Sequence, residues 1–405
     1  MPPPLLPAGA PVSSWRRLWL PMLKGMAVGA VIGVAVGVGW SQLKRADADV
    51  VQLLRDWAGA VSPGLVLVAA LLSLWPHIVL HEAGHAFAGM ATGMRPIAFG
   101  LGRWRWERGM SGWRFRYGDR LGGVSGFASL VPGNRYGLRR IDQALYFAGG
   151  AAANLLTAAV CAALLPSVAS STLPASLLLG VGASALFIGL FNLVPFQVQG
   201  WRSDGLALRD LLTRHPDAAL QMRLQQLMAL SMAGVRPRDW PAELVPLPAD
   251  ATPHSKSPLL ATSASMLRLS WAMDSDMPSE AFDDARRLVS DYPSAPAPFR
   301  PHIAVVMAGF AARCMGDPSL LAAWRPLCEG GLLDLSATRA WLDAELAAAR
   351  GDQSACRAAI PVARQLQDRV PDPATRLLLG EYLDELEARV SQPGPEPRAP
   401  VLRPA

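Results

Sequence analysis

Cysteine and charged residues are both scarce in this chain. It has four cysteines in 405 residues, scattered along the sequence and without a CxxC pair. So few thiols do not suit a disulfide framework, and they favour free cysteines in a reducing compartment. Asp, Glu, Lys and Arg make up 17% of the residues, below the roughly 25% of a typical soluble domain. Hydrophobic residues make up 51%, and the mean hydropathy is +0.23. The composition therefore indicates a membrane protein with a soluble part.

Charge is absent or nearly absent from four long apolar runs. Each run approaches or exceeds the roughly 20 residues that a helix needs to cross a bilayer. The first follows a proline-rich tail, residues 1–17, and a few basic residues, an order that resembles a signal peptide. Its length and the lack of a small-x-small cleavage site favour a retained membrane helix. The predicted membrane helices are Leu18–Trp40, Pro63–Thr92, Ala144–Leu165 and Leu173–Val194.

Arginine is concentrated on one side of these helices. The segment Met94–Gln143 has ten arginines and three acidic residues, whereas the turn Pro166–Thr172 has no charge. Basic loops stay in the cytoplasm, so the positive-inside rule places both chain ends and the arginine-rich segment there. We expect a multi-pass protein of the cell's inner, cytoplasmic membrane.

The arginine-rich segment has strand character. Aromatic residues alternate with arginine in Arg103–Trp106 and in Trp113–Tyr117, and Arg108–Gly112 between them can turn. This pattern predicts a β-hairpin with an aromatic face and a basic face, suited to a membrane surface. We expect the lipid bilayer, and not nucleic acid, as its partner. The following glycine-rich stretch, Leu121–Phe127, suits close approach to another strand.

From Gly205 onward the sequence has ordinary charge density and helical periodicity. Helix starts are predicted near Ser257, Phe299, Ser336 and Pro373, a regular spacing that favours an α-solenoid of tetratricopeptide type. No repeat consensus is present, so a plain helical bundle stays open. The predicted division is a tail (1–17), a membrane domain (18–208, core 63–208), a helical connector and linker (209–256), a helical-repeat-like domain (257–390) and a disordered tail (391–405).

A metal-binding pattern, His81-Glu82-Ala83-Gly84-His85, ends the second apolar run. Histidines four residues apart share a helix face, so His81 and His85 can hold one zinc ion. Glu82 is placed to take a proton from a metal-bound water. The alternative is a pair of helix-end histidines that bond to nearby carbonyls. Ionisable residues at membrane depth are costly and usually functional, which favours the metal site.

A catalytic zinc site commonly needs a third protein ligand. Asp204 begins a polar segment after the fourth apolar run and is our candidate, with Asp210 as a weaker substitute. His77 is a rival, but on one straight helix His77 and His85 are about 12 Å apart, too far for one ion. We expect His77 to lie in the core or to support a metal ligand without binding the metal itself.

These residues resemble the site-2 protease family of intramembrane zinc metalloproteases. The resemblance covers about Pro63–Leu208 and rests on HEAGH, Gly122–Phe127, Gly149–Asn154, Asn192-x-x-Pro195 and Asp204-Gly205. It implies a three-helix core, zinc held by His81, His85 and Asp204, and Glu82 as the base. Asn154 matches the family's substrate-holding asparagine, and Gly123, Val124, Ser125 and Asn192 are the other substrate-binding residues that we predict.

The chain departs from the family pattern at two places. Gly150 is followed by Ala151, where the family usually has Gly-Pro. Gln197–Ser203 also lengthens the interval between Pro195 and Asp204, so Asp204 is the ligand most in question. No segment reads as a PDZ domain or a CBS pair, which leaves regulation or docking to the C-terminal helical domain.

The expected fold class is an all-α polytopic membrane protein with about four membrane helices, three of them forming the protease core. A small membrane-associated β-hairpin region and a cytosolic solenoid-like helical domain complete it. The expected function is zinc-dependent cleavage of single-span membrane proteins or membrane stubs, with a possible regulatory protein at the helical domain. One alternative is a catalytically inactive relative that acts as a membrane scaffold. A transporter or channel is disfavoured because Leu173–Phe191 is almost wholly apolar.

Overall fold

The computed structural model describes residues 5–7, 61–118, 126–168, 170–198, 201–245 and 257–391. The predicted helix Leu18–Trp40 therefore lies outside the described residues. Within them the chain is mostly helical, with a small β region. The contacts divide it into two units, and the boundary passes through the continuous helix α3 at Gly84/His85 and through α4 at Gly149/Gly150. We describe each unit by itself.

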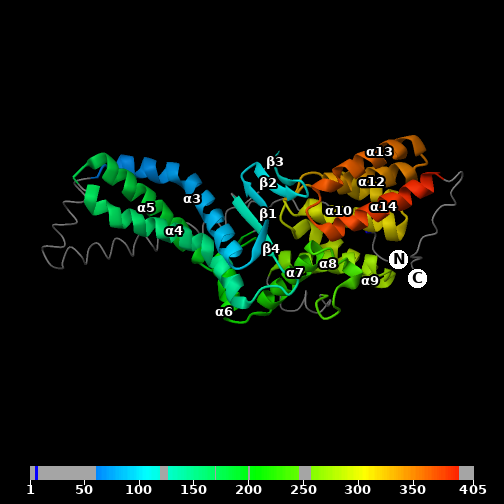
Figure 1. The fold of residues 1–405 in the computed structure, drawn as a ribbon, viewed down its shortest axis with the longest axis horizontal. Helices are drawn as coiled ribbons and strands as arrows, with labels where there is room; N and C mark the ends of the chain where they lie inside the picture. Colours follow the sequence, from blue (N-terminus) through cyan, green and yellow to red (C-terminus); the bar gives the residue numbers. More distant parts are fainter. Residues whose placement is uncertain are drawn as a thin grey trace. The chain divides into compact units, whose positions relative to one another are not determined.

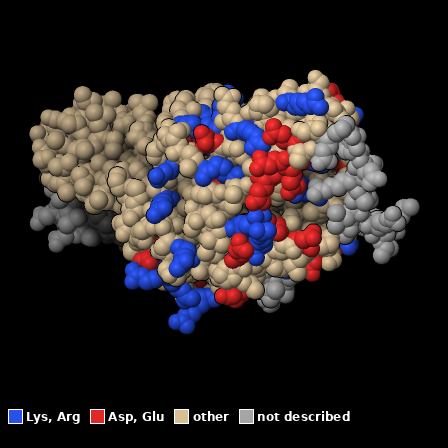
Figure 2. Space-filling view, turned by 45° about the vertical axis from the view of Figure 1, so that its right-hand side comes forward, with Lys and Arg blue, Asp and Glu red and all other residues tan. Residues whose placement is uncertain are grey.

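Three long helices carry the apolar runs (Figure 1). They are α3 (Pro63–Ala91), α4 (Arg140–Val168) and α5 (Thr172–Leu193), and each is long and apolar enough to cross a membrane. Large apolar side chains on them face outward, including Leu72 (74% exposed) and Phe187 (58% exposed). The space-filling view shows a broad uncharged surface over this part of the chain (Figure 2). These helices confirm the last three predicted runs to within a few residues.

Small residues let these helices approach closely. A Cβ added at Gly180 of α5 would lie 2.5 Å from the carbonyl oxygen of Val66 on α3. The hydroxyls of Ser73 and Ser184 join the same two helices at 2.6 Å. Glycine and serine at a helix interface are typical of packing between membrane helices.

A four-stranded antiparallel sheet lies in the other unit. Its strands are β1 (Met94–Leu101), β2 (Trp104–Gly109), β3 (Gly112–Tyr117) and β4 (Gly126–Pro132), in the order β3-β2-β1-β4. The β2–β3 pair confirms the predicted hairpin, with Trp106 opposite Phe115. The sequence did not reveal β1, because its run MRPIAFGL lacks strict alternation. Of the glycine-rich stretch, residues 121–125 lie outside the described residues.

The hairpin's basic face differs from our expectation. We expected arginines near lipid, yet Arg105 is only 1% exposed, and its guanidinium lies over the ring of Phe127. Arg116 pairs with Glu107 on the same face at 2.6 Å. Because Glu107 alternates in phase with these arginines, it neutralises part of the face. The aromatic residues Trp104, Trp113, Phe115 and Tyr117 are exposed, as is Arg108.

The rest of this unit is helical. A two-stranded ladder, β5 (Gln197–Val198) with β6 (Trp201–Arg202), precedes it. Short 3-10 or π turns occur at Pro237–Asp239, Tyr292–Ser294, Ala311–Met315, Arg325–Cys328 and Gln367–Arg369. The helices are α6 (Asp204–Leu212), α7 (Pro216–Met232), α8 (Pro258–Asp274), α9 (Pro278–Asp291), α10 (Arg300–Phe310), α11 (Pro318–Trp324), α12 (Ser336–Ala349), α13 (Gln353–Leu366) and α14 (Pro373–Ser391).

The four predicted helix starts are confirmed. Helix α8 begins one residue after Ser257, α10 begins one residue after Phe299, and α12 and α14 begin at Ser336 and Pro373. Proline is the first residue of α8 and of α14. It suits this position because the first N–H of a helix has no partner within the helix, so the N–H that proline lacks is not missed. The helices from α8 onward, here called the helical domain, share one core. Its fully buried side chains include Leu288, Ile303, Met307, Phe310, Trp324, Leu342, Leu383 and Leu386.

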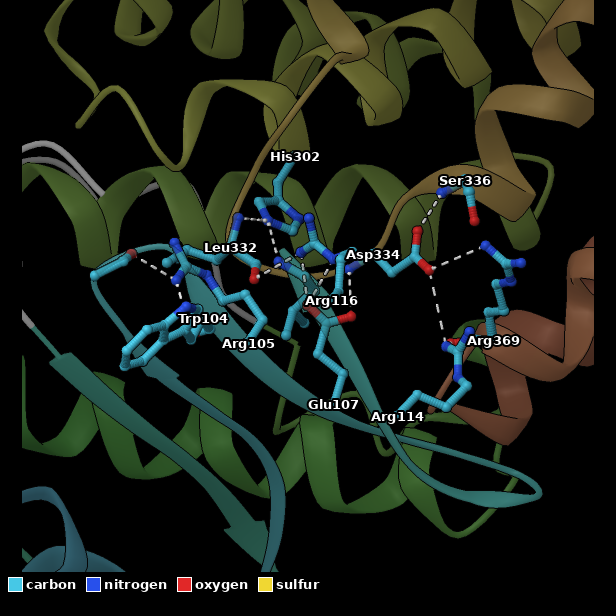
Figure 3. Close-up of polar contacts among 12 residues, drawn as sticks. Trp104, Arg105, Glu107, Arg114, Arg116, His302, Leu332, Asp334, Ser336 and Arg369 are labelled. Carbon is cyan, nitrogen blue, oxygen red and sulfur yellow. Dashed lines mark hydrogen bonds and ion pairs between the residues drawn. The ribbon is translucent and has the colours of Figure 1, made fainter. Parts of the chain in front are cut away.

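The helical domain contacts the β2–β3 hairpin through a group of polar residues (Figure 3). Glu107 of β2 accepts a hydrogen bond from the backbone N–H of Asp334, at 3.1 Å. The Asp334 carboxylate in turn lies 3.8 Å from the guanidinium groups of Arg114 and Arg369. His302 of α10 also holds the loop that contains Asp334, because its Nε2 accepts a hydrogen bond from the backbone N–H of Leu332 at 3.2 Å.

Candidate metal centre

Two buried histidines lie one helical turn apart near the end of α3. His81 and His85 are 7% and 6% exposed, and α3 has no other charged or titratable residues than these, His77 and Glu82. The helical repeat places both rings on one face, as the sequence predicted. Glu82 follows His81 directly and is half-buried. The structure thus gives the HEAGH motif the spacing that two ligands of one ion require.

The ring of His85 is oriented by a backbone carbonyl. Its Nδ1 lies 2.7 Å from the carbonyl oxygen of Tyr146 on α4. A carbonyl can only accept, so Nδ1 carries a proton, and in the neutral ring Nε2 is then the nitrogen with the lone pair. That Nε2 lies 3.3 Å from Oδ2 of Asp204. A histidine whose other nitrogen donates to a carbonyl is the usual arrangement of a metal ligand.

Asp204 is the first residue of α6, and its position is fixed by the residues before it. The hydroxyl of Ser203 caps the helix by accepting from the backbone N–H of Leu206, at 3.1 Å. Phe196 and Ser203 also bond to each other twice, through Ser203 N–H to Phe196 O and Phe196 N–H to Ser203 Oγ, both at 3.0 Å. The β5–β6 ladder lies between them. The residues between Phe196 and Ser203 therefore form a small loop whose two ends are bonded to each other. This places Asp204 close to Phe196 in space, despite the longer interval in sequence.

His81 has a partner on another helix. The side-chain amide of Asn154, on α4, lies 3.3 Å from Nδ1 of His81, and Asn154 is fully buried. The amide's other end, Oδ1, has no hydrogen-bond partner among the described residues. The two ends have the same shape, so a turn of the amide lets Oδ1 accept the Nδ1–H of His81. This leaves Nε2 of His81 available to a metal.

These three residues fit a zinc ion. The ligand atoms of His81, His85 and Asp204 all lie within 4.8 Å of one another. Two ligands of a tetrahedral zinc at 2.0–2.1 Å are about 3.3 Å apart, which matches the His85–Asp204 separation of 3.3 Å. Two imidazole nitrogens and one carboxylate oxygen are also a donor set that catalytic zinc sites use.

The rival ligands are occupied elsewhere. His77 is 3% exposed, and its Nε2 bonds to the carbonyl of Val181 on α5 at 3.0 Å, as expected for a core histidine. Asp210 lies in a second His/Asp group with His215 and Asp217. However, Asp210 bonds to the guanidinium groups of Arg202 and Arg209, which already neutralise its charge.

The predicted substrate-binding residues fare differently. Asn192 donates to the carbonyl of Ile188, one turn earlier in its own helix, at 2.9 Å. Gly123, Val124 and Ser125 lie outside the described residues. Asn154 is buried against His81 and does not lie on an exposed surface. No sequence signal points to the Tyr146 carbonyl, because every residue has one, whereas a serine followed by an aspartate is typical of a helix start.

Comparison with known proteins found no relative of this chain. No protein-family model, curated protein or solved structure matches the chain.

Proposed function

We propose that this chain is a zinc metalloprotease that cleaves membrane-spanning or membrane-anchored proteins within the bilayer. One observation carries the proposal: two buried histidines on an apolar helix share a small space with an aspartate from a separate segment. Burying three ionisable groups is costly unless they have a purpose or a partner. A metal ion supplies both, and the resemblance to site-2 proteases agrees with this assignment.

Each residue has a distinct part in the proposed chemistry. When bound, zinc would act as a Lewis acid and lower the pKa of a water molecule. Glu82 would be the residue that accepts a proton from the attacking water and passes it to the nitrogen of the departing amine. The ring of His85 is held in a fixed orientation because its Nδ1–H donates to the Tyr146 carbonyl. Asn154 orients His81 in the same manner.

The substrate must present an extended backbone to this site. A membrane helix hides its carbonyls in hydrogen bonds, so the scissile segment has to unwind first. Strand β4 lies at an edge of the four-stranded sheet. An unwound segment can add to such an edge through backbone hydrogen bonds. The substrates in this proposal are single-span proteins or the stubs that earlier cleavage leaves.

The proposal places the protein in the inner membrane with both ends in the cytoplasm, as the arginine distribution favours. The helical domain would be a cytosolic module of solenoid type for regulation or docking. Its contact with the β2–β3 hairpin supports this role, since Asp334 and Glu107 join the domain to the sheet. A regulatory protein bound there could act on the sheet without touching the metal.

Replacing Glu82 by glutamine tests the function. The variant should retain zinc at wild-type stoichiometry and lose cleavage by at least about 10²-fold, because the proton acceptor is gone while the ligands remain. Membrane proteomes of cells with wild-type protein and with Glu82→Gln should differ by accumulated membrane stubs. Equal cleavage by both proteins would refute the proposal. Purified wild-type protein without zinc would favour the inactive scaffold instead.

A further inference from the structure

A short piece of the N-terminal tail is buried in the helical domain. Leu5, Leu6 and Pro7 are described, although residues 1–4 and 8–60 are not. Leu5 is 8% exposed and belongs to the core cluster of the helical domain, whereas its neighbour Leu6 is 49% exposed. One leucine is therefore an anchor and the next faces solvent, as in a bound peptide.

A side chain of the helical domain donates a hydrogen bond to the backbone of this segment. The indole N–H of Trp324 donates to the carbonyl oxygen of Leu5 at 2.9 Å, and Trp324 is fully buried. Among the described residues this N–H has no other acceptor. A buried donor without an acceptor costs free energy, so the domain's own fold leaves a polar requirement that the tail satisfies.

The receptor side of this contact is built by the domain itself. Trp324 ends α11, whose start is capped by Asp317 accepting from the N–H groups of Ser319 and Leu320. The ring of Tyr292 packs edge-on against Trp324, with the ring centroids 5.2 Å apart. Both side chains are held from within the domain, 319 positions along the chain from Leu5 in the case of Trp324. The site is thus positioned independently of the tail.

The sequence of the tail suits a peptide ligand. Pro7 restricts Leu6 before it to extended conformations. Proline-rich segments lose little conformational freedom on binding, which favours their capture by aromatic-lined sites. A buried side-chain anchor combined with one backbone hydrogen bond is the minimal form of such recognition.

We propose that the helical domain carries a receptor site for an extended leucine–proline peptide, and that Leu5-Leu6-Pro7 is its built-in occupant. A segment of similar chemistry on another protein binds only when it displaces this tail. Because the tail belongs to the same chain, it competes with any separate peptide as an intramolecular ligand, whose advantage does not depend on protein concentration. The inference does not depend on the proposed protease activity.

Peptide binding to the full-length protein in detergent tests this site. The probe is a fluorescein-labelled peptide with the sequence of residues 2–9, followed by fluorescence anisotropy. Leu5→Asp should eject the tail and open the site, and Leu6→Asp is the matched control because Leu6 is exposed. We expect at least tenfold tighter probe binding to Leu5→Asp than to the wild type or to Leu6→Asp. Deletion of residues 1–7 opens the site in a second way.

Altered peptides then identify the anchor. With the site opened, a probe carrying Asp in place of Leu5 should bind at least tenfold more weakly, because a carboxylate cannot enter an apolar pocket cheaply. A probe with Asp in place of Leu6 should bind within about threefold of the original. Trp324→Phe, checked for helicity by circular dichroism, should weaken binding three- to tenfold through the lost hydrogen bond. Equal binding by both altered probes, or no binding to either opened protein, would overturn the proposal.

Discussion

Asn154 of α4 and His81 of α3 lie against each other, with the amide 3.3 Å from Nδ1 of the imidazole. The asparagine is fully buried, so this contact is its principal polar environment. It ties the orientation of one proposed ligand to a second helix, just as the Tyr146 carbonyl ties His85 to α4. Two independent hydrogen bonds from one helix thus orient both histidines.

Removing the amide should weaken metal binding. Asn154→Leu keeps the volume and loses the hydrogen bond to His81, and loss of such a supporting contact typically costs 10- to 100-fold in metal affinity. Asn192→Leu is the control, because among the described residues Asn192 bonds within its own helix, to Ile188. Zinc affinity by chelator competition measures the effect. If both variants hold zinc as tightly as the wild type, Asn154 does not orient a ligand.

The two candidate aspartates should behave in opposite ways. Asp204→Ala should lose zinc while the fold remains, since Asp204 faces His85 at 3.3 Å. Asp210→Asn should keep zinc and lose stability by about 3–5 kcal/mol, because it removes the ion-pair partner of the largely buried Arg202. Metal content and thermal unfolding separate the two outcomes. Zinc loss in Asp210→Asn alone would move the third ligand to Asp210.

Acid should destabilise the loop around Leu332 and Asp334, which contacts the β2–β3 hairpin. Burial, together with the nearby Arg116, lowers the pKa of His302 from its ordinary 6.5 to about 4. The unfolded chain therefore takes up this proton first, so the stability that neutral His302 provides is complete above pH 6.5 and is lost as the pH falls toward 4. The loss is on the order of 3 kcal/mol at most.

The comparison variant for this pH effect is His302→Asn, whose side-chain oxygen can still accept from the loop. Its free energy of unfolding should fall less between pH 6.5 and 4 than that of the wild type. Hydrogen exchange of Leu332 and Leu333, whose N–H groups bond to His302, reports the same event locally. Parallel stability curves for the two proteins would show that another group controls this range.

Enlarging Gly180 should disrupt the helix core. A Cβ there meets the Val66 carbonyl at 2.5 Å and the Ala69 Cβ at 2.7 Å, so Gly180→Leu forces α3 and α5 apart. Overpacking of this kind typically costs 1–3 kcal/mol. Gly64→Leu is the control, because within the described part of the chain a Cβ at Gly64 meets just the Ser62 hydroxyl, at 4.0 Å. Thermal unfolding in detergent should show a lower Tm for Gly180→Leu only.

The features that the sequence predicted are those with a local cause. Charge-free runs predicted α3, α4 and α5, and Ser257 and Pro373 marked helix starts because their chemistry suits a helix N-terminus. The spacing of His81 and His85 follows from the helix repeat alone.

Features that depend on distant partners escaped prediction. Strand β1 has no alternating pattern and exists because β2 and β4 pair with both of its edges. Arg105 is buried because Phe127 and backbone carbonyls surround it. Whether Asp204 could reach His85 also depended on a ladder that no pattern in Gln197–Ser203 announced.

That ladder changes how motif spacing should be understood here. Since Phe196 and Ser203 are bonded to each other, the chain between them can lengthen or shorten without moving Asp204. A search that demands a fixed interval between Asn192-x-x-Pro195 and the aspartate would therefore reject a chain in which the aspartate lies beside His85. For such a motif, the quantity that matters to the site is a distance in space and not a number of residues.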